Sequence, residues 1–246
     1  MSDLEKMRAA GKLAAQTLDY LKHRVVDGIT TNEINKVVHD FTIDHGAIPA
    51  PLNYKGFPKS VCTSVNHVVC HGIPSDKVLH DGDIVNIDVT TILDGWHGDT
   101  SRTFLVGKPS IKAKKLVETT REAMMRGIEV IKPGATTGDI GHAIESFVNG
   151  KYGIVKDYCG HGIGEEFHTN PQIFHHGQSG TGTTLIEGMF ITVEPMLNIG
   201  KDAVKELSDG WTVVTRDRSL SAQFEHTIAV VADGYEILTL SDNDRI

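Results

Sequence analysis

The chain repeats one local pattern at a fixed offset, and this repeat constrains its fold more than any other feature. Residues 28–34 (GITTNEI) are echoed 106 positions later by residues 134–140 (GATTGDI). Each copy opens a stretch with helical character, in which a threonine hydroxyl caps the first turn and an acidic side chain follows. The same start signal in two similar stretches predicts two related halves.

The same offset recurs in two apolar segments that end in a carboxylate. Residues 81–88 (DGDIVNID) resemble residues 187–194 (EGMFITVE), so Asp88 and Glu194 occupy equivalent positions 106 residues apart. Each segment combines an acidic-glycine turn with an apolar strand. Because each half delivers a carboxylate from the end of a strand, we expect a functional site at the seam between the halves.

Helical and extended segments alternate in blocks, which favours an α+β architecture. Apolar periodicity and capping signals predict helices near 3–22, 30–46, 110–131 and 137–150. Strands are predicted near 60–70, 83–91, 97–106, 157–160, 189–198, 211–215, 222–231 and 235–240, with hairpin turns at Asp94-Gly95 and Asp233-Gly234. Since no Pro- or Ser-rich linker interrupts the chain, we expect one domain of residues 1–246, with halves of roughly 1–107 and 108–246.

Charge and cysteine usage restrict the class of partner. The formal net charge of −8 argues against a nucleic-acid backbone or an anionic membrane as the main partner. The N-terminal segment mixes charged and apolar residues at helical spacing, unlike a signal peptide, and no apolar run approaches the length of a membrane span. Three cysteines are an odd number in a chain too long to need disulfides, which favours a reducing, cytoplasmic location.

The segment from Asp88 to Ser101 is typical of a hairpin that brings two carboxylates together. With a two-residue turn at Asp94-Gly95, Asp88 lies opposite Ser101 and Asp99 is its diagonal neighbour on the same face. Diagonal neighbours lie about 7–8 Å apart at the backbone, so bare carboxylates there repel each other unless a divalent cation lies between them. Two solvated strand residues are the alternative, but the apolar run before Asp88 indicates a buried position, where an unpaired carboxylate is costly.

Histidines and glutamates follow in further segments. His71 lies in CHGIP, His161 lies in GHGIG shortly before His168, and Glu194 and Glu225 belong to apolar strands. Glycines on both sides of His161 leave room for the close approach of an ion. Hydrogen-bonded core histidines and salt-bridged glutamates are the alternatives for each residue taken alone. The GHGIG segment lacks the GxGxxG spacing of a phosphate loop.

Taken together, four strand carboxylates and one glycine-flanked histidine indicate a metal centre. Oxygen-rich ligands with one imidazole suit Mn, Fe, Co or Zn. Four carboxylates carry more negative charge than one divalent ion neutralises, so we expect two ions. Ion pairs about 3.5–4 Å apart recur in enzymes that activate water. The residues therefore predict metal-assisted hydrolysis without naming the substrate.

Six segments, in order and at matching spacing between about Met7 and Leu240, resemble the type I methionine aminopeptidases. They are NYKGFPKSVCTSVNHVVCHGIP, DGDIVNIDVT, DGWHGDTSRTF, YCGHGIGEEFH, GMFITVEPM and DGWTVVTRDRSLSAQFEHT. The resemblance implies the duplicated pita-bread fold, in which two pseudo-symmetric halves form a central curved antiparallel sheet with outer helices. It also implies removal of the N-terminal methionine from nascent proteins and peptides, preferentially when the second residue is small.

The resemblance assigns two divalent ions to Asp88, Asp99, His161, Glu194 and Glu225. Asp99 and Glu225 would bridge the two ions. Asp88 would complete one ion site, and His161 with Glu194 would complete the other. Glu194 would also move a proton during hydrolysis of the first peptide bond.

Other matched positions concern the substrate. His168 would steady the oxyanion that develops at the scissile carbonyl, and His71 would contact the peptide backbone nearby. Aromatic rings and soft sulfur suit a thioether, and the implied methionine pocket consists of Tyr54, Phe57, Cys62, Cys70, Phe167 and Trp211. Plain core packing is the alternative for each of these. Some members carry a cysteine where this chain has Pro51, so the pocket wall differs there.

The resemblance further implies a structural monovalent cation near the backbone carbonyls of Asn66, Val68 and Ser221, and a cytoplasmic monomer acting on nascent chains, including ribosome-associated ones. A proline-specific aminopeptidase or prolidase of the same fold is one alternative, although such enzymes usually carry an extra N-terminal domain, for which this chain leaves no room. A metal-free binding protein is another, although it should have lost ligands. A dinuclear phosphoesterase fits the ligand set but not the motif order.

Overall fold

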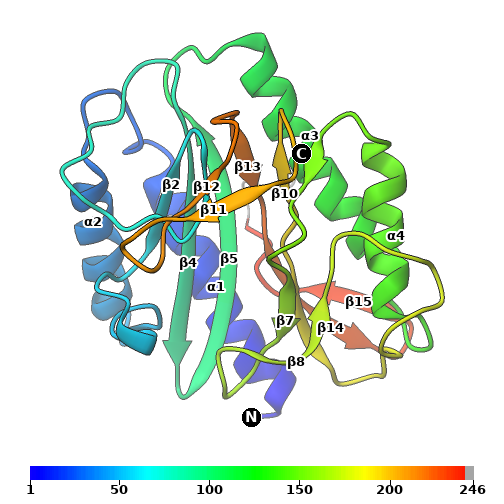
Figure 1. The fold of residues 1–246 in the computed structure, drawn as a ribbon. Coiled ribbons are helices and arrows are strands. Elements are labelled where there is room, and N and C mark those ends of the chain that lie inside the picture. Colours follow the sequence, from blue (N-terminus) through cyan, green and yellow to red (C-terminus); the bar gives the residue numbers. More distant parts are fainter. Residues whose placement is uncertain (242–246) are drawn as a thin grey trace.

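The computed structural model describes residues 1–241, and Figure 1 shows their helices and strands. The helices are α1 (Asp3–Leu21), α2 (Thr31–Asp44), the short 3₁₀ helix η1 (Tyr54–Gly56), α3 (Ile111–Ile128) and α4 (Thr137–Val148). The strands of the first half are β1 (Ile48–Pro49), β2 (Cys62–Val65), β3 (Val68–Cys70), β4 (Ile84–Leu93) and β5 (Trp96–Leu105). Those of the second half are β6 (Gly153–Ile154), β7 (Gly160–Gly162), β8 (Thr169–Ile173), β9 (Phe190–Val193), β10 (Met196–Asn198), β11 (Val204–Glu206), β12 (Val213–Thr215), β13 (Ser221–Gln223), β14 (His226–Val231) and β15 (Gly234–Ile237). Within residues 1–241, no helix has both the length and the apolar character that a membrane span requires.

Two of the helices begin at equivalent points of the sequence repeat. Thr30 and Thr136 each accept the backbone N–H of the third helical residue, whose acidic side chain accepts the N–H of the threonine in return. Both threonines also form isolated antiparallel bridges, Thr30 with Val78 and Thr136 with Thr184. The two bridge partners are again 106 positions apart, so the repeat extends from local capping to tertiary contacts.

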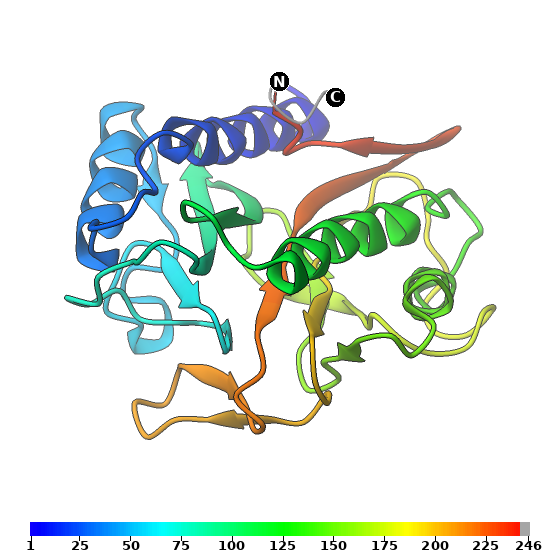
Figure 2. The ribbon, with the colours of Figure 1, turned by 90° about the horizontal axis from the view of Figure 1, so that it is seen from above.

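Every strand pair in the described part of the chain is antiparallel, and the strands form four sheets. In the first half, β4 lies between β2 and β1 and also pairs with β5; in the second, the order is β15-β14-β9-β7-β8. Two three-stranded sheets, β13-β10-β6 and β11-β12-β3, complete the set. Figures 1 and 2 show α1 and α2 outside the strands of the first half, and α3 and α4 outside those of the second.

Several backbone contacts join the two halves, among them the pairing of β3 with β12 and one reciprocal pair beside the carboxylates. Ser101 in β5 and Glu225 between β13 and β14 exchange hydrogen bonds, with Ser101 N–H donating to Glu225 O at 3.3 Å and Glu225 N–H donating to Ser101 O at 3.1 Å. Thr103 Oγ1 donates to Gln223 O, and Thr227 Oγ1 donates to Asp99 O, both at 2.7 Å. Each threonine lies two residues after the Ser101–Glu225 pair, and each acceptor lies two residues before it. Exchanging the halves maps these bonds onto each other, as expected for a duplicated fold.

Each half has its own hydrophobic core beneath its helices. Leu18 and Ile87 belong to the core between α1, α2 and the β4–β5 hairpin. Met124 and Ile191 belong to the core between α3, α4 and the second set of strands. A smaller cluster around Trp96 joins α1 to β5 and β14. These cores hold the inner strands rigidly while their ends face the seam.

Three predicted strands prove to be interrupted. The strand predicted at 60–70 divides into β2 and β3, and the one at 222–231 divides into β13 and β14 at Phe224-Glu225. The strand predicted at 189–198 divides at Glu194-Pro195, because proline has no N–H to continue a ladder. The strand predicted at 157–160 begins only at Gly160. The sequence also gave no prediction of β1, β6, β8 or β11.

One predicted hairpin turn is correct and the other is wrong by one residue. Leu93 pairs with Trp96, which leaves Asp94-Gly95 as the predicted two-residue turn. In the β14–β15 hairpin, Val231 pairs with Gly234, so the turn is 232–233 and not 233–234. Gly234 has φ +150 and can begin the strand, because glycine tolerates this backbone region.

A close helix contact gives a test of the fold. Gly11 lies inside α1, where alanine normally stabilises a helix by about 1 kcal/mol relative to glycine. Here a Cβ would lie 2.6 Å from Leu238 O, so Gly11→Ala should instead lower the free energy of unfolding by about 1–3 kcal/mol. Urea unfolding measures the change.

Gly127→Ala in α3 is the matched control. Its Cβ would meet the Ile144 side chain, whose end can move aside, so we expect a smaller loss of stability than for Gly11→Ala. A gain in stability for Gly11→Ala would contradict the close packing of α1 on the C-terminal segment.

Candidate metal centre

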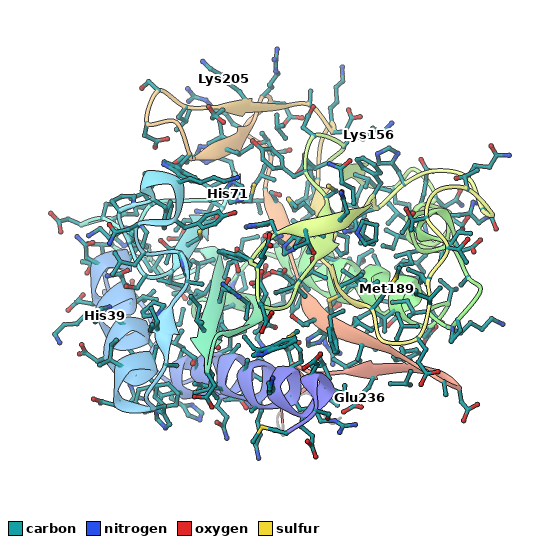
Figure 3. All side chains as sticks on the ribbon, turned by 90° about the horizontal axis from the view of Figure 1, so that it is seen from below. His39, His71, Lys156, Met189, Lys205 and Glu236 are labelled. Atoms are coloured by element: carbon teal, nitrogen blue, oxygen red, sulfur yellow. The ribbon has the colours of Figure 1, made fainter. Side chains whose placement is uncertain are left out.

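A cavity of about 400 Å³ opens at the seam between the halves. It is lined by all the residues assigned from the sequence to divalent-metal ligation, catalysis or the methionine pocket, namely Tyr54, Phe57, Cys62, Cys70, His71, Asp88, Asp99, His161, Phe167, His168, Glu194, Trp211 and Glu225. The other lining residues are Pro51, Lys55, Thr90, Asp157, Tyr158, Cys159, Met196 and Gln223. Figure 3 shows this region from below, with His71 beside the β11–β12 hairpin that carries Lys205.

The β4–β5 hairpin delivers the two aspartates of the first half. Asp88 pairs with Ser101, and Thr90 pairs with Asp99, so the two aspartates are diagonal neighbours as predicted. Thr90 Oγ1 donates to Asp99 Oδ1 at 2.7 Å and so orients this carboxylate. Asp99 is only 3% exposed. The register of one hairpin thus sets the separation of two acidic groups.

The second half contributes a histidine between two glycines. His161 lies in β7, where a Cβ at Gly160 would fall 2.3 Å from Thr192 O. The strand can therefore lie this close to its neighbours only with glycine at that position. His161 Nδ1–H donates to Gly162 O at 2.9 Å, which leaves Nε2 as the unprotonated nitrogen. A histidine that binds a metal through Nε2 needs this tautomer.

The two glutamates lie where strands end. Glu194 follows β9, and its two carboxylate oxygens accept bonds from Thr192 Oγ1 at 2.8 Å and from Gln223 Nε2 at 3.2 Å. Glu225 lies between β13 and β14 and is 2% exposed. Two bonds therefore orient the Glu194 carboxylate, and a Glu225 oxygen lies within 4.8 Å of ligand atoms of Asp99 and His161.

Enclosure dominates the electrostatics of these groups. Loss of hydration raises the pKa of Asp88 to about 7 and that of Glu194 to about 8. The same effect, with repulsion from neighbouring carboxylates, raises the pKa values of Asp99 and Glu225 well above their ordinary range. Loss of hydration also lowers the pKa of His161 to about 4, so its ring is neutral near pH 7.

These residues fit a divalent metal ion. One ligand atom from each of Asp99, His161 and Glu225 lies within 4.8 Å of the others. His161 Nε2 is 3.6 Å from both Asp99 Oδ2 and Glu194 Oε1. Among the lining residues, all within the described chain, the one lysine or arginine is the exposed Lys55. A bound cation would therefore supply the positive charge that the protein itself does not place among the carboxylates.

Two further histidines line the cavity. His168 is exposed at its mouth, and its Nδ1 lies 2.9 Å from the hydroxyl of Tyr54. Loss of hydration, followed by the charges of His161 and Lys55, lowers the pKa of His168. His71 has φ +55, an uncommon backbone region for a non-glycine residue. This strain is consistent with a position fixed for function.

Rings and sulfur atoms form the apolar wall. Phe57 meets Trp211 edge to face with ring centroids 5.1 Å apart, and Tyr54 meets Phe167 at 4.8 Å. The members predicted from the sequence lie together on this wall. The structure adds Tyr158 and Met196 to the same cavity; both lie in the matched segments YCGHGIGEEFH and GMFITVEPM but were not assigned to the pocket. Cys62 and Cys70 are buried thiols whose pKa values are raised by loss of hydration.

Sequence reasoning also missed the side chains that orient the ligands. Thr90, Thr192 and Gln223 each donate to a predicted ligand. Thr192 and Gln223 lie two residues before Glu194 and Glu225, respectively, and this period-two spacing was the signal that could have found them. For Thr90, the signal was its place opposite Asp99 in the hairpin.

Comparisons with known proteins identify the family of the chain. A model of metallopeptidase family M24 matches residues 5–232. The chain belongs to metallopeptidase family M24. The methionine aminopeptidase of Rickettsia prowazekii is 63% identical to this M24 chain over 241 residues, which cover 97% of the chain and 93% of that protein. The crystal structure of methionine aminopeptidase from Rickettsia prowazekii matches with 62% identity and a TM-score of 0.96, and covers 97% of each chain.

These likenesses confirm the resemblance to the methionine aminopeptidases and the pita-bread fold. The prolidase from Pyrococcus furiosus matches 98% of this M24 chain and 64% of its own chain, with 24% identity and a TM-score of 0.74. That likeness concerns the fold alone. The proline-specific alternative and the metal-free binding protein are therefore not favoured for this M24 metallopeptidase.

The metal ligands can be tested by removing single charges. Asp99→Asn and Glu225→Gln should each bind Mn²⁺ far more weakly than the unchanged protein, because each loses an anionic ligand at the centre of the cluster. Calorimetric titration of metal-stripped protein measures the affinity. Asp94→Asn in the exposed hairpin turn is the control and should bind normally. Normal affinity in either of the first two variants would contradict its assignment.

Proposed function

We propose that this metallopeptidase releases the N-terminal methionine from peptides and nascent proteins, preferentially when the second residue is small. One observation carries the proposal: the acidic, histidine-containing floor of the cavity adjoins a wall of rings and sulfur atoms. Sulfur gains from contact with aromatic rings, so this wall suits the thioether of methionine. The nearly full-length likeness to methionine aminopeptidases at 63% identity supports the same substrate.

We infer that two divalent ions occupy the centre, because four carboxylates exceed the charge of one. Asp99 and Glu225 would bridge them, Asp88 would complete one site, and His161 with Glu194 would complete the other. Mn, Fe, Co and Zn all suit this mixture of oxygen ligands and one imidazole. When bound, such ions supply Lewis acidity, which makes water a stronger nucleophile near neutral pH.

The protein's own groups complete the reaction. Glu194 would also accept a proton from the attacking water and pass it to the leaving amine; its carboxylate lies within the predicted ligand cluster, 3.6 Å from His161 Nε2. His168 would donate from Nε2–H to the scissile carbonyl oxygen. Tyr54 lies 2.9 Å from Nδ1, where its hydroxyl would donate to this nitrogen and so leave the ring proton on Nε2. His71 would contact the peptide backbone on the other side of the cavity.

Several further properties stay predictions. The monovalent cation was predicted at Asn66, Val68 and Ser221. Ser221 N–H donates to Asn66 O at 2.9 Å, so two of these segments lie side by side.

Free thiols at Cys62, Cys70 and Cys159 support a cytoplasmic location. We also propose that the enzyme acts as a monomer on nascent chains, including those at the ribosome, and neither on nucleic acid nor at membranes.

Two tripeptides test the substrate. After metal stripping and readdition of a single divalent metal, the protein should release methionine from Met-Ala-Ser and leave Ala-Pro-Ser intact, as followed by chromatography. Metal-stripped protein should be inactive. Alanine release from the second peptide would move the activity to the proline-specific class, and activity without metal would contradict metal-assisted hydrolysis.

His168→Ala tests the oxyanion role. The variant should keep its metal affinity but lower kcat by about 100–1000-fold, the usual loss for one oxyanion donor. Tyr54→Phe should give a smaller loss, because it removes only the hydroxyl that orients the ring. If His168→Ala instead lost the metal, the residue would act as a ligand and the proposed role would be wrong.

A further inference from the structure

A buried histidine holds the backbone of Glu194. Strand β9 ends at Val193, and Pro195 follows Glu194, so the ladder stops at this residue. The backbone N–H of Glu194 donates instead to Nε2 of His175 at 3.1 Å. His175 follows β8 and is 1% exposed. An imidazole thus takes the place of the next strand partner.

This bond defines the state of the His175 ring. Because Nε2 accepts a hydrogen bond, it carries no proton, and the neutral ring then holds its proton on Nδ1. Loss of hydration, followed by the charge of His176, lowers the pKa of His175 to about 3, which keeps the ring neutral near pH 7. Nδ1 is buried and has no hydrogen-bond partner among residues 1–241.

The unpartnered Nδ1 of His175 lowers the stability of the fold, and an apolar side chain would avoid this loss. A buried polar atom without a partner destabilises a fold. Histidine at this position therefore points to the benefit of its other nitrogen, the acceptor for Glu194. Packing alone would be met as well by leucine, which has no polar atom to bury.

The segment that carries His175 is itself fixed. A Cβ on Gly141 in α4 would lie 2.4 Å from the carbonyl oxygen of His176, so the helix touches this backbone directly. On the other side, β8 pairs with β7, the strand of His161. His175 therefore links α4 and β7 to the strand end that bears Glu194.

We propose that His175 is a positioning residue for the metal centre, in which its neutral ring fixes the peptide plane from which the Glu194 carboxylate extends toward His161. The proposal rests on the assignment of Glu194 as a metal ligand. Thr192 and Gln223 restrain the carboxylate oxygens, whereas His175 restrains the backbone behind them. Groups that orient metal ligands in this way typically change metal affinity or activity by about 10–100-fold when replaced.

Two amide substitutions separate positioning from packing. In His175→Gln the amide oxygen reaches about as far as Nε2, so it can still accept the Glu194 N–H. In His175→Asn the amide reaches only as far as Nδ1, so the bond is lost. Titration calorimetry of metal-stripped protein with Mn²⁺ should give near-normal affinity for His175→Gln and about 10–100-fold weaker binding for His175→Asn.

Activity and stability provide further readouts. On Met-Ala-Ser, His175→Asn should lower kcat with little change in KM, and His175→Gln should restore kcat. His176→Asn, the same substitution on the half-buried neighbour, is the matched control and should leave the Mn²⁺ affinity unchanged. Equal Mn²⁺ affinities for His175→Asn and His175→Gln, with a difference only in the Tm of the metal-free proteins, would show a structural role and overturn the proposal.

Failure of the proposed function gives a different pattern. If Glu194→Gln bound Mn²⁺ as tightly as the unchanged protein, the ligand assignment of Glu194 would be wrong, and the proposal for His175 would fall with it. Weak binding by Glu194→Gln together with normal binding by His175→Asn would overturn the role of His175 alone. Neither measurement depends on which peptide the enzyme cleaves.

Discussion

The enclosure of four carboxyl groups around one cavity is the constraint that the rest of the structure must satisfy. Loss of hydration raises the pKa values of Asp88 and Glu194, and repulsion between the carboxylates adds to this effect at Glu194, Asp99 and Glu225. A fold can hold them only if rigid elements enforce their positions and a positive charge compensates them. These positions are held by the β4–β5 hairpin, by the capped helices behind the strands and by the hydrogen bonds at the seam. A bound cation would provide the compensation.

The site also shows how a duplicated scaffold carries predicted metal ligands that are only partly duplicated. Asp88 and Glu194 occupy equivalent positions of the repeat. In β5 and in the segment from β13 to β14, the two halves match in their backbone hydrogen bonds but not in their side chains. Glu225 faces Ser101 across the seam, and the N–H groups of Asp99 and Gln223 make matching bonds to threonine hydroxyls of the opposite half. Gln223, the counterpart of an acidic ligand, donates to Glu194 instead. The backbone is symmetric, whereas the chemistry is not.

Sequence patterns predicted those features that depend on local rules. A two-residue turn fixes its own register, so the placement of Asp88 opposite Ser101 followed from Asp94-Gly95. Helix starts followed from caps, which are equally local. His175 was beyond such reasoning. It is one of thirteen histidines, and its bond to Glu194 depends on how β7, β8 and β9 lie together. The ends of the strands at the site were missed for the same reason. A strand ends where its pairing with neighbouring strands stops, and this depends on tertiary contacts rather than on its own residues.

The reciprocal bonds of Ser101 and Glu225 join the halves through backbone atoms close to the metal ligands. A hinge motion that parted the halves would break these bonds and draw Asp99 away from Glu225, so the predicted ligands would separate. Tyr54 and the exposed Lys55 line the same cavity but take no part in these bonds. Exposed side chains change rotamer within picoseconds to nanoseconds. The cavity can therefore change shape at its exposed side chains without parting the halves.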